Sequence, residues 1–404
     1  MTTETAWPRT LIVGGGIAGL TAAVALRGLG AVVEVAEQTP AFGVVGSGVT
    51  IQANANAVLS ALGITLGDDD AVPIGSFTMI DERGRPVLHG DAREIMVDPP
   101  SVNVHRADLH RVLLEAADGV PLRPGVAVTG VTPVGDEVEV AFDDGSAGRW
   151  DLVVGADGVR SAVRRALLGE AGSRTRYSGQ TCWRFAIEAP DLVPTATIEQ
   201  WAVGRRMGAV PLARGRIYVY LVASAPPGTP GPGSSEPAAL AERFGGHHEV
   251  LDRIFERLDG VAIHHGDLVE HVDVSFGAGR VVLIGDAAHA MTPNLGQGAG
   301  SAIEDAGALA LELLAHSDDP TAIAAGLDAR RRARVTFMQR TAWRIGAMGH
   351  WRNPVARWLR NAMLRMVPQS VSDKQTVQLW QPGLELAAAL REAGYPRPLP
   401  ASAA

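Results

Sequence analysis

The sequence predicts an α/β protein with two units, one built on a parallel sheet and one built on mostly antiparallel strands. Residues 10–29 and 280–314 each read as an apolar strand, a glycine-containing turn and a helix, which predicts the parallel unit. Apolar and polar residues alternate between 171 and 267, which predicts the antiparallel unit.

The first strand–turn–helix segment carries a dinucleotide-binding pattern. Leu11–Val13 is an apolar run, and the turn after it fits G-x-G-x-x-G through Gly14, Gly16 and Gly19. Glu37 closes the next strand, where a carboxylate would accept the ribose hydroxyls of an adenine dinucleotide. Such glycines also occur where they only pack a helix on a strand. The strand before them, the helix after them and the later acid favour a Rossmann-like dinucleotide site.

The second segment suits a flavin. Residues 281–284 read as a buried strand that ends at Asp286, and a loop with three glycines between 296 and 300 leads into a helix at about 301–314. Glycines leave backbone N–H groups bare, and the helix N-terminus behind them is partly positive. An acid, a bare loop and a positive helix end suit a polyol beside a ring that becomes anionic, as reduced flavin does.

Composition narrows the class of protein. The 404 residues carry a net charge of −8, which argues against nucleic acid as a partner. Cys182 is the only cysteine and Lys374 the only lysine, and neither lies in a motif for metal, pyridoxal or P-loop chemistry, so we expect no metal. The short polar start of the chain is neither a signal peptide nor a membrane span, so we expect a cytoplasmic protein.

A third motif makes the pattern specific. Residues 151–158 form an apolar run that ends in Asp157-Gly158, and Ser161 and Arg164 follow it. Together with the glycine turn and Gly285-Asp286, this order resembles the class A, single-component FAD-dependent monooxygenases. The resemblance points in particular to their salicylate hydroxylase-like and urate hydroxylase-like branch, and it covers residues 10–340. It implies a Rossmann-like FAD-binding domain with a parallel sheet, a mostly antiparallel substrate domain and C-terminal helices.

The resemblance also implies the reaction. NADH or NADPH reduces FAD, O2 adds at C4a, and the C4a-hydroperoxyflavin transfers one oxygen atom to an electron-rich aromatic or N-heteroaromatic small molecule. The cofactor carries this chemistry, while the protein positions the substrate and excludes water. The chain has no second G-x-G-x-x-G unit, so we expect the nicotinamide to bind transiently, near Asp157-Gly158 and Arg164.

We divide the chain accordingly into four parts. They are a discontinuous FAD-binding domain (1–72, 98–170 and 268–326), a substrate domain (73–97 and 171–267), a C-terminal helical segment (327–395) and a flexible tail (396–404).

The resemblance implies a set of cofactor contacts. Glu37 is expected on the adenosine ribose, Asp286 on the ribityl chain, and 296–300 against the flavin ring. Asp157 is implied for both FAD and nicotinamide; a helix N-cap is the alternative, and the two roles are compatible. The expected cofactor residues are Gly14, Gly16, Ile17, Ala18, Gly19, Glu37, Ser47, Arg106, Val128, Asp157, Asp286, Pro293, Gly296, Gln297, Gly298, Ala299 and Gly300.

Candidates for the substrate site lie in the antiparallel unit and beside the flavin loop. Trp183, Arg184 and Trp201 are expected to line the pocket. Arg206 and Tyr218 resemble the arginine and tyrosine that urate hydroxylases use on their substrate. Those enzymes have an acid, proposed as the base, where this chain has Asn294. This departure from the family removes the base and puts urate as the substrate in question.

His289, beside the ring by resemblance, is either a proton relay or a structural hydrogen-bonding group.

The C-terminal part is basic. Residues 327–366 hold ten arginines against Asp328 alone, with three tryptophans among them. We expect a helical brace on the FAD-binding domain, which argues against membrane association; a helix lying on a membrane surface is the alternative. A monomer or homodimer is expected. A flavin-dependent reductase or oxidase, and a non-catalytic flavin- or ligand-binding protein, stay open as alternatives.

Overall fold

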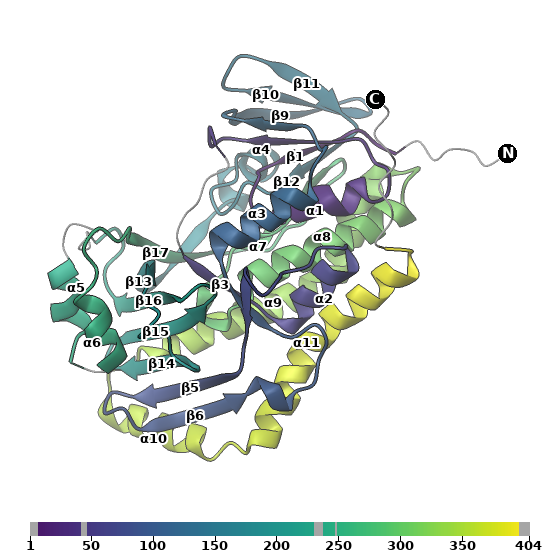
Figure 1. Ribbon diagram of the computed structural model, residues 1–404. Helices are drawn as coiled ribbons and strands as arrows, with labels where there is room; N and C mark the ends of the chain where they lie inside the picture. Colours follow the sequence, from purple (N-terminus) through teal and green to yellow (C-terminus); the bar gives the residue numbers. More distant parts are fainter. Residues whose placement is uncertain (1–6, 42–46, 230–236, 247–248, 396–404) are drawn as a thin grey trace.

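The computed structural model describes residues 7–41, 47–229, 237–246 and 249–395 (Figure 1). The expected tail at 396–404 lies outside these residues. The structure is the mixed α/β fold that the sequence predicts, with one sheet of mainly parallel strands, one large antiparallel sheet and long helices at the C-terminus.

The parallel sheet has the order β18-β19-β12-β1-β2-β8. All neighbours in it are parallel except β18 and β19. Its central strands are apolar on both faces because layers cover each side, and all four residues of β1 are buried. Its strands are β1 (Thr10–Val13), β2 (Val33–Glu37), β8 (Leu122–Pro124), β12 (Leu152–Gly155), β18 (Gly277–Ala278) and β19 (Val281–Leu283).

Helices and two small sheets surround this sheet. The helices are α1 (Ile17–Arg27), α2 (Ala53–Ala61), α3 (Arg106–Ala116), α4 (Ala162–Gly172), α7 (Asp286–His289) and α8 (Gly298–Ala315). One small sheet has β9 (Val128–Val134), β10 (Glu137–Phe142) and β11 (Ala147–Trp150), and the other has β3 (Gly48–Ile51), β7 (Val102–His105) and β4 (Ala71–Pro73).

The antiparallel sheet has the order β17-β13-β16-β15-β14-β5-β6. Its strands are β5 (Ser76–Asp81), β6 (Pro86–Asp91), β13 (Thr175–Glu188), β14 (Thr197–Ala202), β15 (Arg205–Leu212), β16 (Arg216–Ser224) and β17 (His264–His271). The early hairpin β5–β6 joins it because β5 pairs in parallel with β14. Residues on one face, such as Phe185 and Leu221, form a core that also holds residues of α5 (Pro237–Phe244) and α6 (Glu249–Phe255).

The C-terminal helices are α9 (Ile323–Gly349), α10 (Pro354–Arg365) and α11 (Gln369–Glu392). Helix α9 packs on α8, and α11 packs on α2 and α8. After α11, the Tyr395 hydroxyl donates to the carbonyl of Ala25 on α1 at 2.7 Å. Thus α9 and α11 brace the parallel unit, whereas α10 lies at the edge of the molecule beside β6 (Figure 1). Within the described residues, no helix is long and apolar enough to cross a membrane.

Candidate active site

A cavity of about 630 Å³ opens where the strands of the parallel sheet end. Eleven of the expected cofactor residues line this cavity: Gly14, Gly16, Ile17, Ala18, Glu37, Arg106, Val128, Asp157, Asp286, Gly298 and Ala299. Ligands of α/β proteins bind at this edge of the sheet, because the helix N-termini also point there.

The glycine turn shows why side chains are absent at this edge. A Cβ on Gly14, whose φ is +110°, would lie 2.4 Å from the carbonyl oxygen of Ala156, and a Cβ on Gly19 would lie 1.8 Å from that of Gly14. Gly14 and Gly19 therefore allow close packing of backbone. Gly16 has no atom within 4 Å of a Cβ built on it and lines the cavity, so its empty side faces the ligand.

The loops on either side of the turn are held by Glu37. Its carboxylate accepts from the backbone N–H of Gly15 at 2.7 Å and from Thr39 through both the backbone N–H at 2.8 Å and the hydroxyl at 2.6 Å. Glu37 also lines the cavity. The acid thus shapes the turn in addition to facing the cavity.

The opposite wall is the N-terminus of α8. No side chain caps this helix and no acid lies in its first turn, so its free N–H groups and partial positive charge face the cavity at Gly298 and Ala299. Asp286, exposed at the start of α7, lines the same cavity. Bare glycine backbone, a helix N-terminus and a carboxylate suit the phosphates and polyol of FAD, so these residues fit the cofactor.

Replacing Asp286 with alanine is expected to weaken FAD retention about tenfold or more, because a hydrogen bond to a charged acceptor is worth roughly 1.5–3 kcal/mol. FAD release can be followed by the recovery of flavin fluorescence on dilution. Asp136→Ala, at a fully exposed aspartate, is the matched control. Equal retention in both variants would contradict a contact between Asp286 and the cofactor.

Asp157 stands both at the cavity and at the start of α4. It lines the cavity, and its carboxylate accepts from the Ser161 hydroxyl at 2.5 Å and from the backbone N–H groups of Ala162 and Val163 at 2.7 and 3.2 Å. Burial raises the pKa of Asp157, and these hydrogen bonds oppose the rise. The acid therefore caps α4 while it borders the cavity.

Arg164 has a structural position that the sequence did not suggest. It is fully buried, and its guanidinium donates to four backbone carbonyls, those of Gly172, Asp273, Ala287 and Ala288. It fastens α4 to α7, and its guanidinium is already occupied by carbonyls, so transient nicotinamide binding near this motif stays a prediction that needs no contact from Arg164. The sequence reading missed Arg160 and Arg165, which line the cavity from the same motif.

Six expected cofactor residues are not among the cavity residues that the structure describes. Gly19 packs on Gly14, and Gly300 packs on α2, where a Cβ would lie 3.3 Å from that of Ala55. The side chain of Gln297 points into the protein, with its amide nitrogen 2.6 Å from Gln52 Oε1 and its oxygen 3.0 Å from Asn54 Nδ2. The others are Ser47, just before β3, Pro293, in a short 3-10 helix, and Gly296, which follows that helix.

Arg206 and Asn294 form one unit on the face of the antiparallel sheet opposite α5 and α6. The Arg206 guanidinium, with 3% of the side chain exposed, donates to Asn294 Oδ1 and lies 3.3 Å from Glu199 Oε1. Asn294 donates in turn to the Thr292 hydroxyl and to the carbonyl of Ala342, both at 3.0 Å. Both the oxygen and the nitrogen of the Asn294 amide are therefore already hydrogen-bonded within the protein.

His350 completes this unit. Burial and Arg206 lower its pKa to about 3, so the ring is neutral at physiological pH. Its Nε2 accepts from Arg206 Nε at 3.4 Å, which leaves Nδ1 to donate to the Ser224 hydroxyl at 3.0 Å. Among the residues that the structure describes, Glu199 is thus the one carboxylate that pairs with Arg206.

Tyr218 and Arg184 lie on the same face, nearer the cavity. Burial raises the pKa of Tyr218, against the opposing effect of Arg184 and Arg106. The tyrosine ring packs directly on Gly48, where a Cβ would lie 2.5 Å from its Cγ. Cys182, and to a smaller extent Tyr218 and Asp286, raise the pKa of Arg184. Arg184 therefore stands between the sheet and the cofactor edge.

The expectation for Trp183 was wrong. Its side chain is fully buried in the core with Phe244 and stacks on His265 with 4.5 Å between ring centroids. Because neighbours on a strand point to opposite faces, Arg184 and Trp183 cannot line one pocket. Trp201 is on the correct face but buried against Met79 and Val87, and its indole N–H donates to Glu199 at 2.7 Å.

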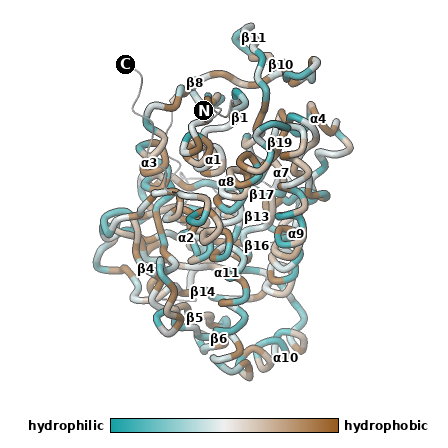
Figure 2. Tube along the Cα trace, turned by 90° about the vertical axis from the view of Figure 1, so that its right-hand side faces the viewer, coloured by the Kyte–Doolittle hydropathy of each residue, from teal (hydrophilic) through white to brown (hydrophobic). Residues whose placement is uncertain are grey.

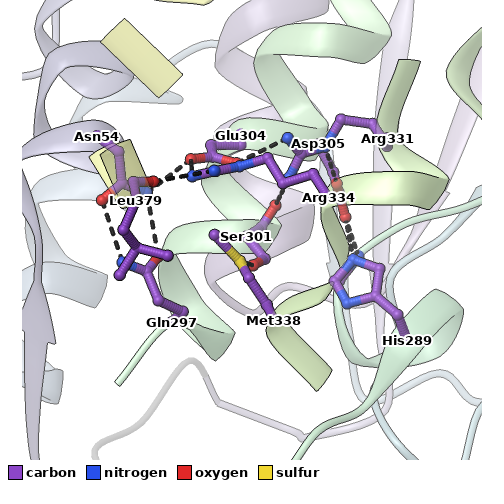
Figure 3. Close-up of polar contacts among 11 residues, drawn as sticks. Asn54, His289, Gln297, Ser301, Glu304, Asp305, Arg331, Arg334, Met338 and Leu379 are labelled. Atoms are coloured by element: carbon purple, nitrogen blue, oxygen red, sulfur yellow. Dashed lines mark hydrogen bonds and ion pairs between the residues drawn. The ribbon is translucent and has the colours of Figure 1, made fainter. Parts of the chain in front are cut away.

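His289 belongs to a buried ionic network (Figure 3). Its Nε2 lies 2.5 Å from Asp305, and Arg331 joins Asp305 to Glu304 at 2.8 and 2.7 Å. Glu304 also meets Arg334 at 2.6 Å. His289 is 1% exposed and is not among the cavity residues, so this geometry favours the structural alternative over a proton relay.

Comparisons with known proteins agree with this site. A family described as an FAD binding domain matches residues 8–344. Aurachin C monooxygenase/isomerase from Stigmatella aurantiaca is 37% identical, over 91% of this chain and 96% of that protein. The 2-heptyl-3-hydroxy-4(1H)-quinolone synthase from Pseudomonas aeruginosa is 35% identical, over 89% and 94%.

A solved structure is similar over nearly the whole chain. HpxO from Klebsiella pneumoniae, in complex with FAD and uric acid, has a TM-score of 0.85 and 25% identity, covering 93% of this chain and 97% of that one. When bound, FAD accepts electrons from NAD(P)H and activates O2, and the residues that line the cavity would hold and orient it. The chain belongs to the FAD-binding-domain family and is an FAD-dependent, NAD(P)H-consuming monooxygenase of small aromatic and N-heteroaromatic molecules.

Proposed function

We propose that this enzyme hydroxylates an uncharged N-heteroaromatic of the 4(1H)-quinolone class. The observation that carries the proposal is the pairing of Arg206 with Glu199 on the sheet face opposite α5 and α6. An anionic substrate would place a second negative charge beside an arginine that is already balanced, and separating the buried pair is costly. A neutral substrate leaves the pair intact.

The carboxamide at Asn294 supports the same class of substrate. It is held by Arg206, Thr292 and Ala342 and cannot remove a proton. In a 4(1H)-quinolone, the ring nitrogen donates electron density to carbon 3 without prior ionisation, so no base is needed for attack on an electrophilic oxygen. One oxygen atom of O2 is then inserted between carbon 3 and its hydrogen to give a hydroxyl, and the second atom leaves as water with two electrons and one proton from NAD(P)H and a second proton from solvent.

The two relatives described above support the choice further. One of them is a 2-heptyl-3-hydroxy-4(1H)-quinolone synthase, and both align with about nine-tenths of this chain. HpxO, whose fold this chain shares, is complexed with uric acid, an N-heteroaromatic, while the pairing of Arg206 with Glu199 argues for a neutral ring here.

A substrate panel tests the proposal. Purified protein with FAD is mixed with a 2-alkyl-4(1H)-quinolone, urate or 3-amino-4-hydroxybenzoate, and NAD(P)H oxidation is followed together with the mass of the product. We expect a coupled gain of one oxygen atom on the quinolone, with kcat/KM at least about tenfold above the anions. A carboxylate or urate as the best coupled substrate would refute the neutral-substrate proposal.

Replacing Glu199 with glutamine should shift this preference. Arg206 then carries an unbalanced charge, so we expect KM for anionic aromatics to fall and the coupling with a neutral quinolone to decrease, each by roughly tenfold. Glu139→Gln, in an exposed pair with Arg149, is the matched control. If the two variants rank substrates alike, Glu199 does not set the charge of the site.

A further inference from the structure

Helix α10 is placed with its apolar side outward. Val355, Trp358, Leu359, Met363 and the following Met366, here called the α10 stripe, are 71%, 69%, 52%, 62% and 79% exposed. Their spacing of three and four residues puts them on one side of a helix. Figure 2 shows apolar residues along α10 at the lower edge of the molecule.

The opposite side of α10 is polar and faces the protein. Arg357 pairs with Glu82, and Arg360 donates to the carbonyl of Met348 at 2.8 Å and lies over the ring of Trp201 at 4.9 Å. Arg365 reaches Asp81 at 3.1 Å. An amphipathic helix on a soluble core normally buries its apolar side, so this helix is fixed through its arginines and leaves a large apolar surface without a partner among the described residues.

The charge of the sequence that flanks α10 indicates what covers the α10 stripe. Residues 340–374 contain seven basic residues against Asp373, in a chain whose net charge is −8. Three of the seven, Arg357, Arg360 and Arg365, are used on the inner side. The other four, Arg340, Arg344, Arg352 and Lys374, are exposed and form no ion pair with any carboxylate that the structure describes.

We infer that α10 docks the enzyme on an anionic lipid surface, with the α10 stripe inserted at the level of the headgroups and the free basic residues over lipid phosphates. Tryptophan and methionine on one side and unpaired basic residues in the flanking sequence are the features of helices that lie in the membrane interface. A second copy of this chain fits less well, because a two-fold contact through the stripe would bring the same unpaired basic residues of both copies together.

Vesicle flotation with the full-length, FAD-loaded protein tests this inference. Wild type should bind vesicles of mixed phosphatidylcholine and phosphatidylglycerol at least roughly tenfold better than vesicles of phosphatidylcholine alone, and raised salt should weaken binding. Trp358→Asp/Met363→Asp should abolish flotation. The control Val32→Asp/Val134→Asp adds the same charge at two exposed apolar residues away from α10. It should bind vesicles as wild type does.

A second pair of variants separates charge from apolar contact. Arg352→Gln/Lys374→Gln should bind anionic vesicles roughly tenfold more weakly and lose most of the salt dependence. The FAD content and the turnover number, both measured without lipid, should be the same in all variants as in wild type. This result would show that the variants fold.

Two outcomes would overturn the inference. One is equal or absent binding of wild type to both kinds of vesicle. The other is a wild-type dimer by light scattering in lipid-free buffer that Trp358→Asp/Met363→Asp converts to monomer, which would assign the stripe to a second copy.

Discussion

Replacing Arg331 with methionine is expected to lower the free energy of unfolding by about 3–5 kcal/mol, because it removes the only arginine that pairs with Asp305 among the described residues and one of the two that pair with Glu304. Arg331 is 3% exposed and joins Glu304 and Asp305, which are both fully buried. Burial acts against ionisation of Glu304, yet Arg331 and Arg334 hold its pKa below the usual value. Methionine keeps the volume of the chain but removes the charge. The measurement is the midpoint of urea unfolding with an unchanged slope.

Arg332→Met is the matched control, one residue further along α9. Arg332 is 50% exposed and pairs with Asp328 in a surface ion pair, which is worth about 0–1 kcal/mol. Because the folded-state pKa of Glu304 is depressed, its contribution is present above its unfolded value of about 4.5 and is lost as the pH falls through the folded value. Equal midpoints for both variants would show that the buried network does not stabilise the fold.

Gly16→Ala is expected to weaken FAD binding while leaving the protein folded. Gly16 has φ −81° and ψ −169°, which alanine adopts freely, and a Cβ there meets no protein atom within 4 Å. That Cβ would instead project into the cavity, where the backbone must approach the pyrophosphate. We expect FAD affinity to fall by tenfold to a hundredfold, from an overpacking cost of roughly 1–3 kcal/mol.

Gly14→Ala serves as the contrasting variant. Its Cβ would collide with the carbonyl of Ala156 at 2.4 Å and would require a φ of +110°, so both folding and FAD binding should be lost. The readouts are circular dichroism of the FAD-free protein and flavin fluorescence quenching on titration. A folded Gly16→Ala variant that binds FAD as wild type does would refute the role of this turn.

The local sequence pattern was enough to predict the position of a residue wherever its neighbours along the chain decide that position. The glycine turn, Glu37, Asp286 and the start of α8 all border the cavity, because a strand, a turn and a helix fix them within a few residues. The same rule should have corrected one expectation. Trp183 and Arg184 are adjacent on β13, so alternation alone places one of them in the core.

Long-range contacts could not be predicted in this way. The partner of Arg206 is Glu199 across a hairpin, and its other neighbours, Asn294 and His350, come from distant segments. No periodicity in the sequence reveals such pairing, because it depends on how the sheet face meets α9. Arg164 likewise looked available for a ligand, and only the fold shows it saturated by carbonyls.

The order of strands in the parallel sheet has a consequence during protein synthesis. Strand β1 has both of its neighbours, β2 and β12, once residue 155 has been made, but Asp286 and the start of α8 complete the cavity only after residue 299 has been made. At a synthesis rate of about 5–20 residues per second, the nascent chain waits roughly 15 seconds to a minute between Gly14 and Gly298. FAD therefore meets a finished site only late in translation, so cofactor supply and slowed elongation at low temperature should raise the yield of loaded enzyme during expression.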